Sequence, residues 1–180
     1  MKESGLEGYE FFAYISYCDQ DAAFAKKLQR YLEHYKLPVL LSRQYPRTPR
    51  KLTPVFREDT PQSGALAKTK FLIPICSEAA AHVDEWGGSR VDAEVRDFVA
   101  VAPEVNRSRV IPIIFRQKDG ARATACIPAA VKALDLLALD VLDKGYEQVC
   151  NQLVSRMVGI KPGVLWNRWL RKARRNMALA

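Results

Sequence analysis

The sequence predicts an α/β fold in which helices cover both faces of a parallel sheet of about five strands. Apolar runs of strand length alternate with longer segments whose apolar residues recur at helical spacing. Strands that are apolar throughout are typical of parallel sheets, because helices bury both of their faces. The alternation continues along most of the 180 residues, which favours one domain that is flavodoxin-like in plan.

The first strand is predicted at residues 11–17, the longest run of apolar and aromatic residues near the start. A helical pattern follows from Asp19, a favourable N-cap residue, to about Lys36, and Pro38 prevents the helix from continuing. We expect this strand to be the middle of the sheet. Because ligands bind at the carboxyl edge of such sheets, its polar end is expected to form the floor of a substrate pocket.

The next part of the chain is less regular. Residues 42–51 are basic and interrupted by two prolines, which predicts an irregular excursion. Residues 52–56 are a candidate second strand, whose proline is tolerated only near the strand start or at a sheet edge. Only residues 65–70 remain for a second helix before a strong buried strand at 71–77.

A second long helix is predicted to begin after Ser89, with Asp92 as its capping-box partner. Its apolar stripe consists of Val91, Val95, Phe98 and Ala102. The remaining elements are expected to be a strand at 109–115, a short helix within 127–134, a strand at 136–139 and an amphipathic helix at 146–158 that ends at Gly159.

The net charge is +8, and the basic residues are clustered. One cluster consists of Arg43, Arg47, Arg50, Lys51 and Arg57. A second lies in residues 163–180, which contain no acid. A solvated face is the common explanation of such clusters, and an anionic membrane surface is the partner we consider for 163–180. No nucleic-acid-binding motif accompanies the charge, so no specific nucleic-acid partner is expected.

Boundaries follow from these patterns. We expect a disordered leader at residues 1–8, a folded domain at 9–160 and a basic amphipathic helix at 161–180. The four cysteines are scattered and lack metal-ligand spacing, which favours reduced core thiols in a cytoplasmic protein and no metal site.

Glu94 is the main candidate for chemistry. At about 100° per residue, it lies roughly 60° from the mean direction of the apolar stripe of its helix. It therefore lies between core and solvent, early in a helix that begins near the sheet edge. A partly desolvated carboxylate there suits proton or cation chemistry. The alternative is a helix-boundary Glu that interacts with the helix dipole or with Arg90.

Weaker candidates surround it. Trp86 could stack on a flat cationic ring, although a tryptophan that covers the core is the commoner case. Ser16 and Ser77 end two strands and could face one ligand, and Arg57 could contact a phosphate. Each of these residue types also occurs at such positions without any function.

Five motifs in order resemble those of a bacterial Toll/interleukin-1 receptor (TIR) domain. They are Phe12–Tyr17 with Asp21, Leu32–Pro38, Leu52–Asp59, Phe71–Ser77 and Glu94–Phe98. The similarity covers about residues 9–160. It implies a flavodoxin-like TIR fold with a five-stranded parallel sheet.

The resemblance also implies an activity. Many bacterial TIR domains cleave NAD⁺ at the nicotinamide–ribose bond, and Glu94 matches their catalytic glutamate. NAD⁺ is then a substrate and no cofactor is needed. The loop from Arg57 to Gly64 is expected to close the site, often across a contact with a second copy, so self-assembly would activate the protein in defence or stress signalling. The substrate-binding residues implied are Tyr14, Ser16, Tyr17, Asp21, Phe56, Arg57, Ser77 and Trp86.

Two departures from the family pattern keep alternatives open. The family tryptophan lies four residues before the glutamate, where this chain has Arg90, and Trp86 lies eight before it. The segment between Arg57 and Phe71 is also shorter than in the family, so most of the second helix is missing. A non-catalytic TIR–TIR interaction module is the main alternative, and a nucleoside-processing transferase of similar sheet plan is a weaker one.

Overall fold

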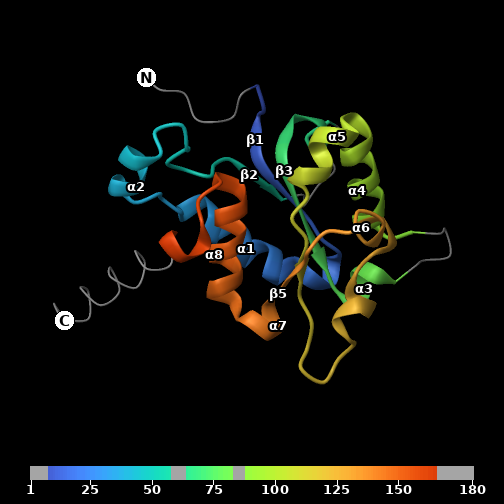
Figure 1. Cartoon of the computed structure of the whole chain (residues 1–180). Helices are drawn as coiled ribbons and strands as arrows, with labels where there is room; N and C mark the ends of the chain where they lie inside the picture. The colour runs from blue at the N-terminus through green and yellow to red at the C-terminus, as the bar shows by residue number, and fades with distance from the viewer. Residues whose placement is uncertain (1–7, 58–63, 83–87, 166–180) are drawn as a thin grey trace.

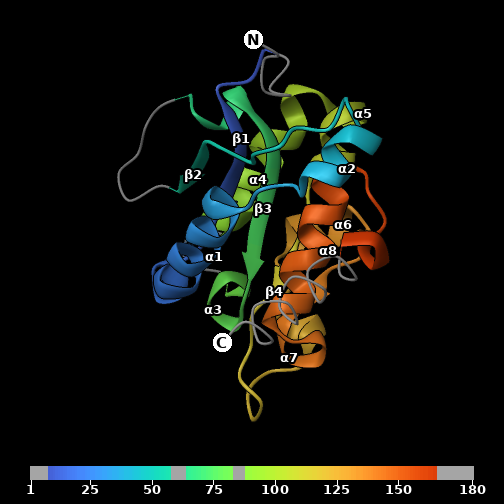
Figure 2. The ribbon, with the colours of Figure 1, turned by 90° about the vertical axis from the view of Figure 1, so that its left-hand side faces the viewer.

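The computed structural model describes residues 8–57, 64–82 and 88–165. Its sheet has five parallel strands in the order β2-β1-β3-β4-β5 (Figures 1 and 2). The strands are β1 (Phe11–Ser16), β2 (Val55–Arg57), β3 (Thr69–Cys76), β4 (Ile113–Ile114) and β5 (Leu139–Asp140). The predicted fold class, a flavodoxin-like α/β fold with a parallel sheet, is therefore confirmed.

β3 rather than β1 is the middle strand, so the expectation for residues 11–17 is wrong by one position. β1 nevertheless has a neighbour on each side, because Ala13 is paired with Val55 of β2 and with Phe71 of β3. Both β1 and β3 are buried almost throughout, and burial alone does not tell the middle strand from its neighbour. The order of strands depends on the crossover connections, which apolar patterns do not reveal.

Helices cover both faces of the sheet, in two separate hydrophobic clusters. The longer helices are α1 (Ala22–His34), α4 (Arg90–Val101) and α8 (Tyr146–Val158). The shorter ones are α2 (Val39–Gln44), α3 (Glu78–Ala81), α5 (Pro103–Asn106), α6 (Ala129–Ala133), α7 (Val141–Lys144) and the 3₁₀ turns η1 (Asp19–Asp21), η2 (Leu66–Lys68), η3 (Arg107–Arg109) and η4 (Ala123–Cys126). One cluster includes residues of α1 and α8, and the other includes residues of α4 and α6 (Figures 1 and 2).

The three long helices match the sequence predictions closely. Ser89 caps α4, and α8 ends at Gly159, whose φ of 72° and ψ of 20° are left-handed as expected for that position. Asp19 is not the N-cap of α1: it opens the 3₁₀ turn η1, and α1 begins three residues later. The short helix predicted after Pro128 is present as α6.

The last two strands are shorter than predicted. Residues 109–115 provide only two residues to β4, because Arg109 belongs to η3 and Pro112 has no N–H for strand pairing. Residues 136–138 precede β5 rather than forming it, and Leu137 is 74% exposed. These residues follow Asp135, whose φ of 51° turns the chain after α6.

The middle of the chain contains one unexpected helix and lacks another. α2 was not predicted, and its second half falls within the segment expected to be irregular, residues 42–51. Leu41 of this helix is fully buried. The second helix is reduced to the 3₁₀ turn η2, as the short segment predicted, because β3 begins at Thr69. β2 begins immediately after Pro54 and lies at the sheet edge, as its proline required.

The ends of the chain fall largely outside the described residues, so the leader at 1–8 and the helix at 161–180 stay predictions. Within the described ranges, no helix combines the length and the apolar character that crossing a bilayer requires.

Alkaline pH is expected to destabilise the fold through the contact between α1 and α8. Burial raises the pKa of Tyr35 to about 12 and that of Cys150 to about 12, and it also raises the pKa of Tyr31 and Tyr146. The folded chain therefore keeps protons that the unfolded chain loses above about pH 8.5 for thiols and about pH 10 for phenols. The free energy of unfolding should fall as the pH rises through this window. Urea unfolding measured across it would contradict the expectation if the midpoint stayed constant.

Candidate functional site

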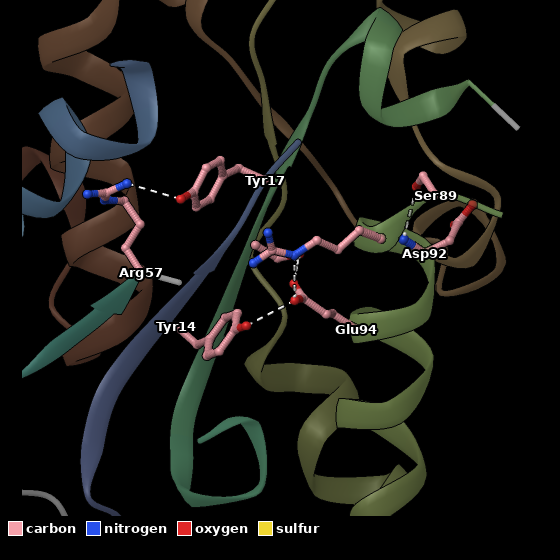
Figure 3. A network of polar contacts seen from close by, with 8 residues as sticks. Tyr14, Tyr17, Arg57, Ser89, Asp92 and Glu94 are labelled. Carbon is pink, nitrogen blue, oxygen red and sulfur yellow. Dashed lines mark hydrogen bonds and ion pairs between the residues drawn. The ribbon is translucent and has the colours of Figure 1, made fainter. Parts of the chain in front are cut away.

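The carboxylate of Glu94 lies over the carboxyl end of β1. The Tyr14 hydroxyl donates a hydrogen bond to Glu94 Oε1 at 2.9 Å (Figure 3). The Ser16 hydroxyl donates one to Oε2. Tyr14 and Ser16 are two residues apart on a strand, so both side chains point to the face that α4 covers. The Glu94 side chain is 14% exposed. The structure therefore places this carboxylate at the carboxyl edge of the sheet, partly shielded from water.

Arg90 is the third partner of Glu94. Its Nε donates to Glu94 Oε1 at 3.0 Å, one helical turn away, and its side chain is 38% exposed. Burial opposes the charge of the guanidinium, but the bond to Glu94 and the nearby Tyr14 outweigh it, so the pKa of Arg90 is raised. Arg90 therefore stays positively charged beside the carboxylate.

Tyr17 lies between two arginines. Arg57 donates from a terminal nitrogen to the Tyr17 hydroxyl at 3.0 Å, and its guanidinium carbon lies 5.7 Å from the ring centre. The guanidinium carbon of Arg90 lies 5.5 Å from the same ring centre. Gln29 of α1 accepts a bond from Arg57 Nε at 3.1 Å and donates to Val55 O, which holds Arg57 in place. Two positive groups thus meet at one aromatic ring, a setting that suits an anionic ligand.

Phe56 extends the aromatic surface beside Glu94. In the β1–β2 register it is paired with Tyr14, and the two rings lie 5.2 Å apart at 33°. The structure therefore brings Tyr14, Ser16 and Phe56 together around Glu94. Tyr17 and Arg57 are linked to this group through Arg90.

Asp21 and Ser77 form a second network. Asp21 Oδ2 accepts bonds from the Ser77 hydroxyl at 2.5 Å and from the Cys18 thiol at 2.8 Å, and the Ser77 hydroxyl also accepts the amide of Ala80. Asp21 and Ser77 are each 5% exposed. Burial is the main cause that raises the pKa of Cys18, so its sulfur is a protonated donor at neutral pH. The network joins η1 to the start of α3, which fixes the turns after β1 and β3.

The start of α4 orients Glu94. Ser89 Oγ accepts the amide of Asp92 at 3.2 Å, so the predicted N-cap is present. The capping-box role of Asp92 is wrong, because its carboxylate instead accepts the Ala130 amide of α6 at 2.7 Å. This bond connects α4 to the beginning of α6, and the Asp92 side chain that forms it is 4% exposed.

Loss of the Ser89 cap is expected to destabilise the protein measurably. Ser89→Ala leaves the Asp92 amide without its acceptor and should lower the free energy of unfolding by about 1 kcal/mol. Ser89→Asp retains a capping oxygen and should stay close to the wild type. Equal midpoints for Ser89→Ala and the wild type in urea unfolding would show that the cap contributes nothing.

Some site residues were not predicted, and some predicted ones cannot be placed. The sequence suggested Arg90 only as a neighbour of Glu94, although helical spacing from Glu94 would have identified it as a site residue. Gln29 and Cys18 were not considered for the site, and nothing in the sequence singles them out. Trp86 and most of the loop from Arg57 to Gly64 lie outside the described residues. In the part of the chain that the structure describes, no cluster of three or more His, Cys, Asp or Glu is arranged to hold a metal ion.

Comparison with known families agrees with this arrangement. A family model described as "TIR domain" matches residues 14–154, which is most of the chain and includes the second half of β1, the strands β2 to β5 and Glu94. A search of curated proteins returned no match. The chain belongs to the TIR domain family.

Proposed function

We propose that this TIR domain cleaves NAD⁺ at the bond between nicotinamide and ribose, with Glu94 as its catalytic residue. The observation that supports the proposal is the position of the Glu94 carboxylate, which Tyr14 and Ser16 hold at the carboxyl end of β1. Ligands of open parallel sheets bind at this edge. The TIR family includes NAD⁺-cleaving enzymes, and the resemblance of the motif Glu94–Phe98 to theirs implies that Glu94 is the matching glutamate.

The chemistry needs a negative charge near the ribose. When the bond from the ribose C1′ to the nicotinamide nitrogen breaks, its electron pair leaves with nicotinamide, which becomes neutral. The ribose is left with oxocarbenium character, and a carboxylate in a partly shielded site stabilises that positive charge. Water then adds to C1′ and loses a proton, so the products are nicotinamide, ADP-ribose and one proton. Attack by an adenine nitrogen in place of water would give a cyclic isomer.

The neighbouring residues have roles that fit the rest of the substrate. Arg57 and Arg90 supply positive charge at the Tyr17 ring for the two phosphates of NAD⁺. Phe56 and Tyr14 supply an aromatic surface, and Trp86 is the proposed partner of the nicotinamide ring. Asp21 and Ser77 hold the turns that border the site. We place the protein in the cytoplasm, where contacts between copies complete the site.

A specific observation favours the alternative, a non-catalytic TIR–TIR interaction module. Both oxygens of Glu94 already accept bonds from this chain, and Arg90 forms an ion pair with the carboxylate at the place of the family tryptophan. The second helix, reduced to η2, also leaves less structure beside the loop that would close the site. Such a chain would signal by self-association or capture of another TIR domain without turning over nucleotide.

Incubation of the concentrated or artificially clustered chain with NAD⁺ tests the two functions directly. The enzyme should release nicotinamide together with ADP-ribose or a cyclic isomer, which chromatography separates. Self-association without any loss of NAD⁺ at every concentration would reject the enzyme and support the interaction module. Release of free base from nucleosides would instead indicate a nucleoside-processing transferase.

A further inference from the structure

The segment from Lys36 to Lys51 forms a basic surface around α2 that the proposed catalysis does not use. It carries five exposed cationic side chains and contains no acidic residue. They are Lys36, Arg43, Arg47, Arg50 and Lys51. Within the described residues, none of the ion pairs involves these five side chains. Their charge is therefore available to a partner outside the domain.

The ends of the segment are tied together, which concentrates the charge. Lys36 and Lys51 form an antiparallel bridge, and the Leu37 amide donates to Arg50 O at 2.9 Å. Leu37, Leu41 and Leu52 are 2%, 0% and 0% exposed and anchor the segment to the core. The chain between these anchors is thus held as one compact projection from the fold.

The outer side of α2 is apolar where it meets the basic residues. Val39 is 53% exposed and Leu40 is 59% exposed, although Leu41 beside them is fully buried. Arg43 follows Leu40 by three residues and Val39 by four, so all three lie on neighbouring parts of one helix surface. Adjacent exposed aliphatic side chains framed by cations are the arrangement with which proteins attach to anionic bilayers.

We propose that this surface, which we call the α2 patch, binds the surface of a bilayer that contains anionic phospholipids. Val39 and Leu40 enter the boundary between headgroups and acyl chains, while the five cations contact lipid phosphates and carboxylates. A nucleic acid would use the cations but gain little from two aliphatic side chains, since single strands are held by stacking on aromatic rings. The nearest aromatic residues, Tyr35 and Tyr45, pack against the core.

The α2 patch and the Glu94 site belong to different faces of the sheet. Leu37, Leu41 and Leu52 belong to the hydrophobic cluster that α1 and α8 share, whereas α4 packs in the other cluster. α2 and α4 accordingly lie on opposite sides of the sheet (Figures 1 and 2). A chain attached through the α2 patch would hold its Glu94 edge away from the lipid, and copies attached side by side would be concentrated in two dimensions.

Vesicle flotation with the full chain tests the proposal without any nucleotide. The chain should float with vesicles of phosphatidylcholine and phosphatidylserine and should stay behind with vesicles of phosphatidylcholine alone. Arg43→Gln with Arg47→Gln should weaken the partition into the anionic vesicles on the order of tenfold or more, because each cation near the surface contributes to binding. Val39→Ser with Leu40→Ser should weaken it several-fold even though the charge is unchanged.

Matched variants separate the α2 patch from general effects of charge and apolarity. Lys118→Gln with Arg122→Gln removes the same charge from another exposed loop, and Val101→Ser with Val105→Ser removes two other exposed aliphatic side chains. Both control proteins should bind as the wild type does. Equal flotation of all variants, as would occur if only residues 163–180 bound lipid, overturns the proposal. Binding of duplex DNA or RNA that depends on Arg43 and Arg47, with no preference for anionic vesicles, also overturns it.

Discussion

Glu94→Gln is expected to lower the rate of NAD⁺ cleavage by about a hundredfold or more. Glutamine has the same shape, and its carbonyl oxygen can still accept a bond from Tyr14 or Ser16. It has no negative charge, so it cannot stabilise the positive ribose that forms when nicotinamide leaves. The ion pair with Arg90 is also lost, but a partly exposed pair of this kind contributes only about 0.5 kcal/mol to stability. The fold should therefore survive the substitution that removes the activity.

Asp97→Asn provides the matched control. Asp97 lies on the same helix, is exposed, and loses the same charge when substituted. Its rate of nicotinamide release should equal that of the wild type under identical clustering. If Glu94→Gln retained the wild-type rate, another group would have to perform the chemistry. Loss of activity in both variants would point to the charge of α4 as a whole.

The parts of the fold that the sequence predicted are those with long periodic patterns. α1, α4 and α8 each present an apolar stripe over three or more turns, and β1 and β3 are apolar runs with no competing interpretation. The position of Glu94 followed from the same helical geometry. Its offset from the apolar stripe placed it between core and solvent, and the structure gives it a side chain that is 14% exposed.

The parts that were missed depend on contacts between distant segments. β3 is the middle strand because of how the connections between strands cross the sheet. β4 is short because Pro112 has no N–H for strand pairing and because Arg109 belongs to the turn η3. The Asp92 carboxylate accepts the amide of Ala130, 38 residues away, instead of forming a capping box at the start of its own helix. Local patterns contain no information on such partners, so the second network around Asp21 was equally out of reach.

Tyr14→Phe and Ser16→Ala are expected to lower NAD⁺ cleavage by about tenfold to a hundredfold each, because both residues position Glu94. Each hydroxyl donates to the carboxylate from an almost fully buried side chain, with Tyr14 3% exposed and Ser16 0% exposed. A hydrogen bond to a charged group contributes about 1.5–3 kcal/mol, and each 1.4 kcal/mol or so corresponds to a factor of ten in rate. Without either donor the carboxylate is free to turn toward Arg90, away from the strand end.

Steady-state kinetics distinguish this positioning role from direct substrate binding. If Tyr14 and Ser16 act through Glu94, kcat falls and KM changes little, and neither substitution lowers the residual rate when Glu94→Gln is already present. If they contact NAD⁺ itself, KM rises and each substitution lowers the residual rate further. Tyr45→Phe and Ser108→Ala are the matched controls. Tyr45 follows α2, and Ser108 lies in η3, where its hydroxyl donates to Val105 O. Both variants should retain wild-type kinetics. A rise in KM with kcat unchanged would therefore show that Tyr14 and Ser16 act as substrate contacts and not by positioning Glu94.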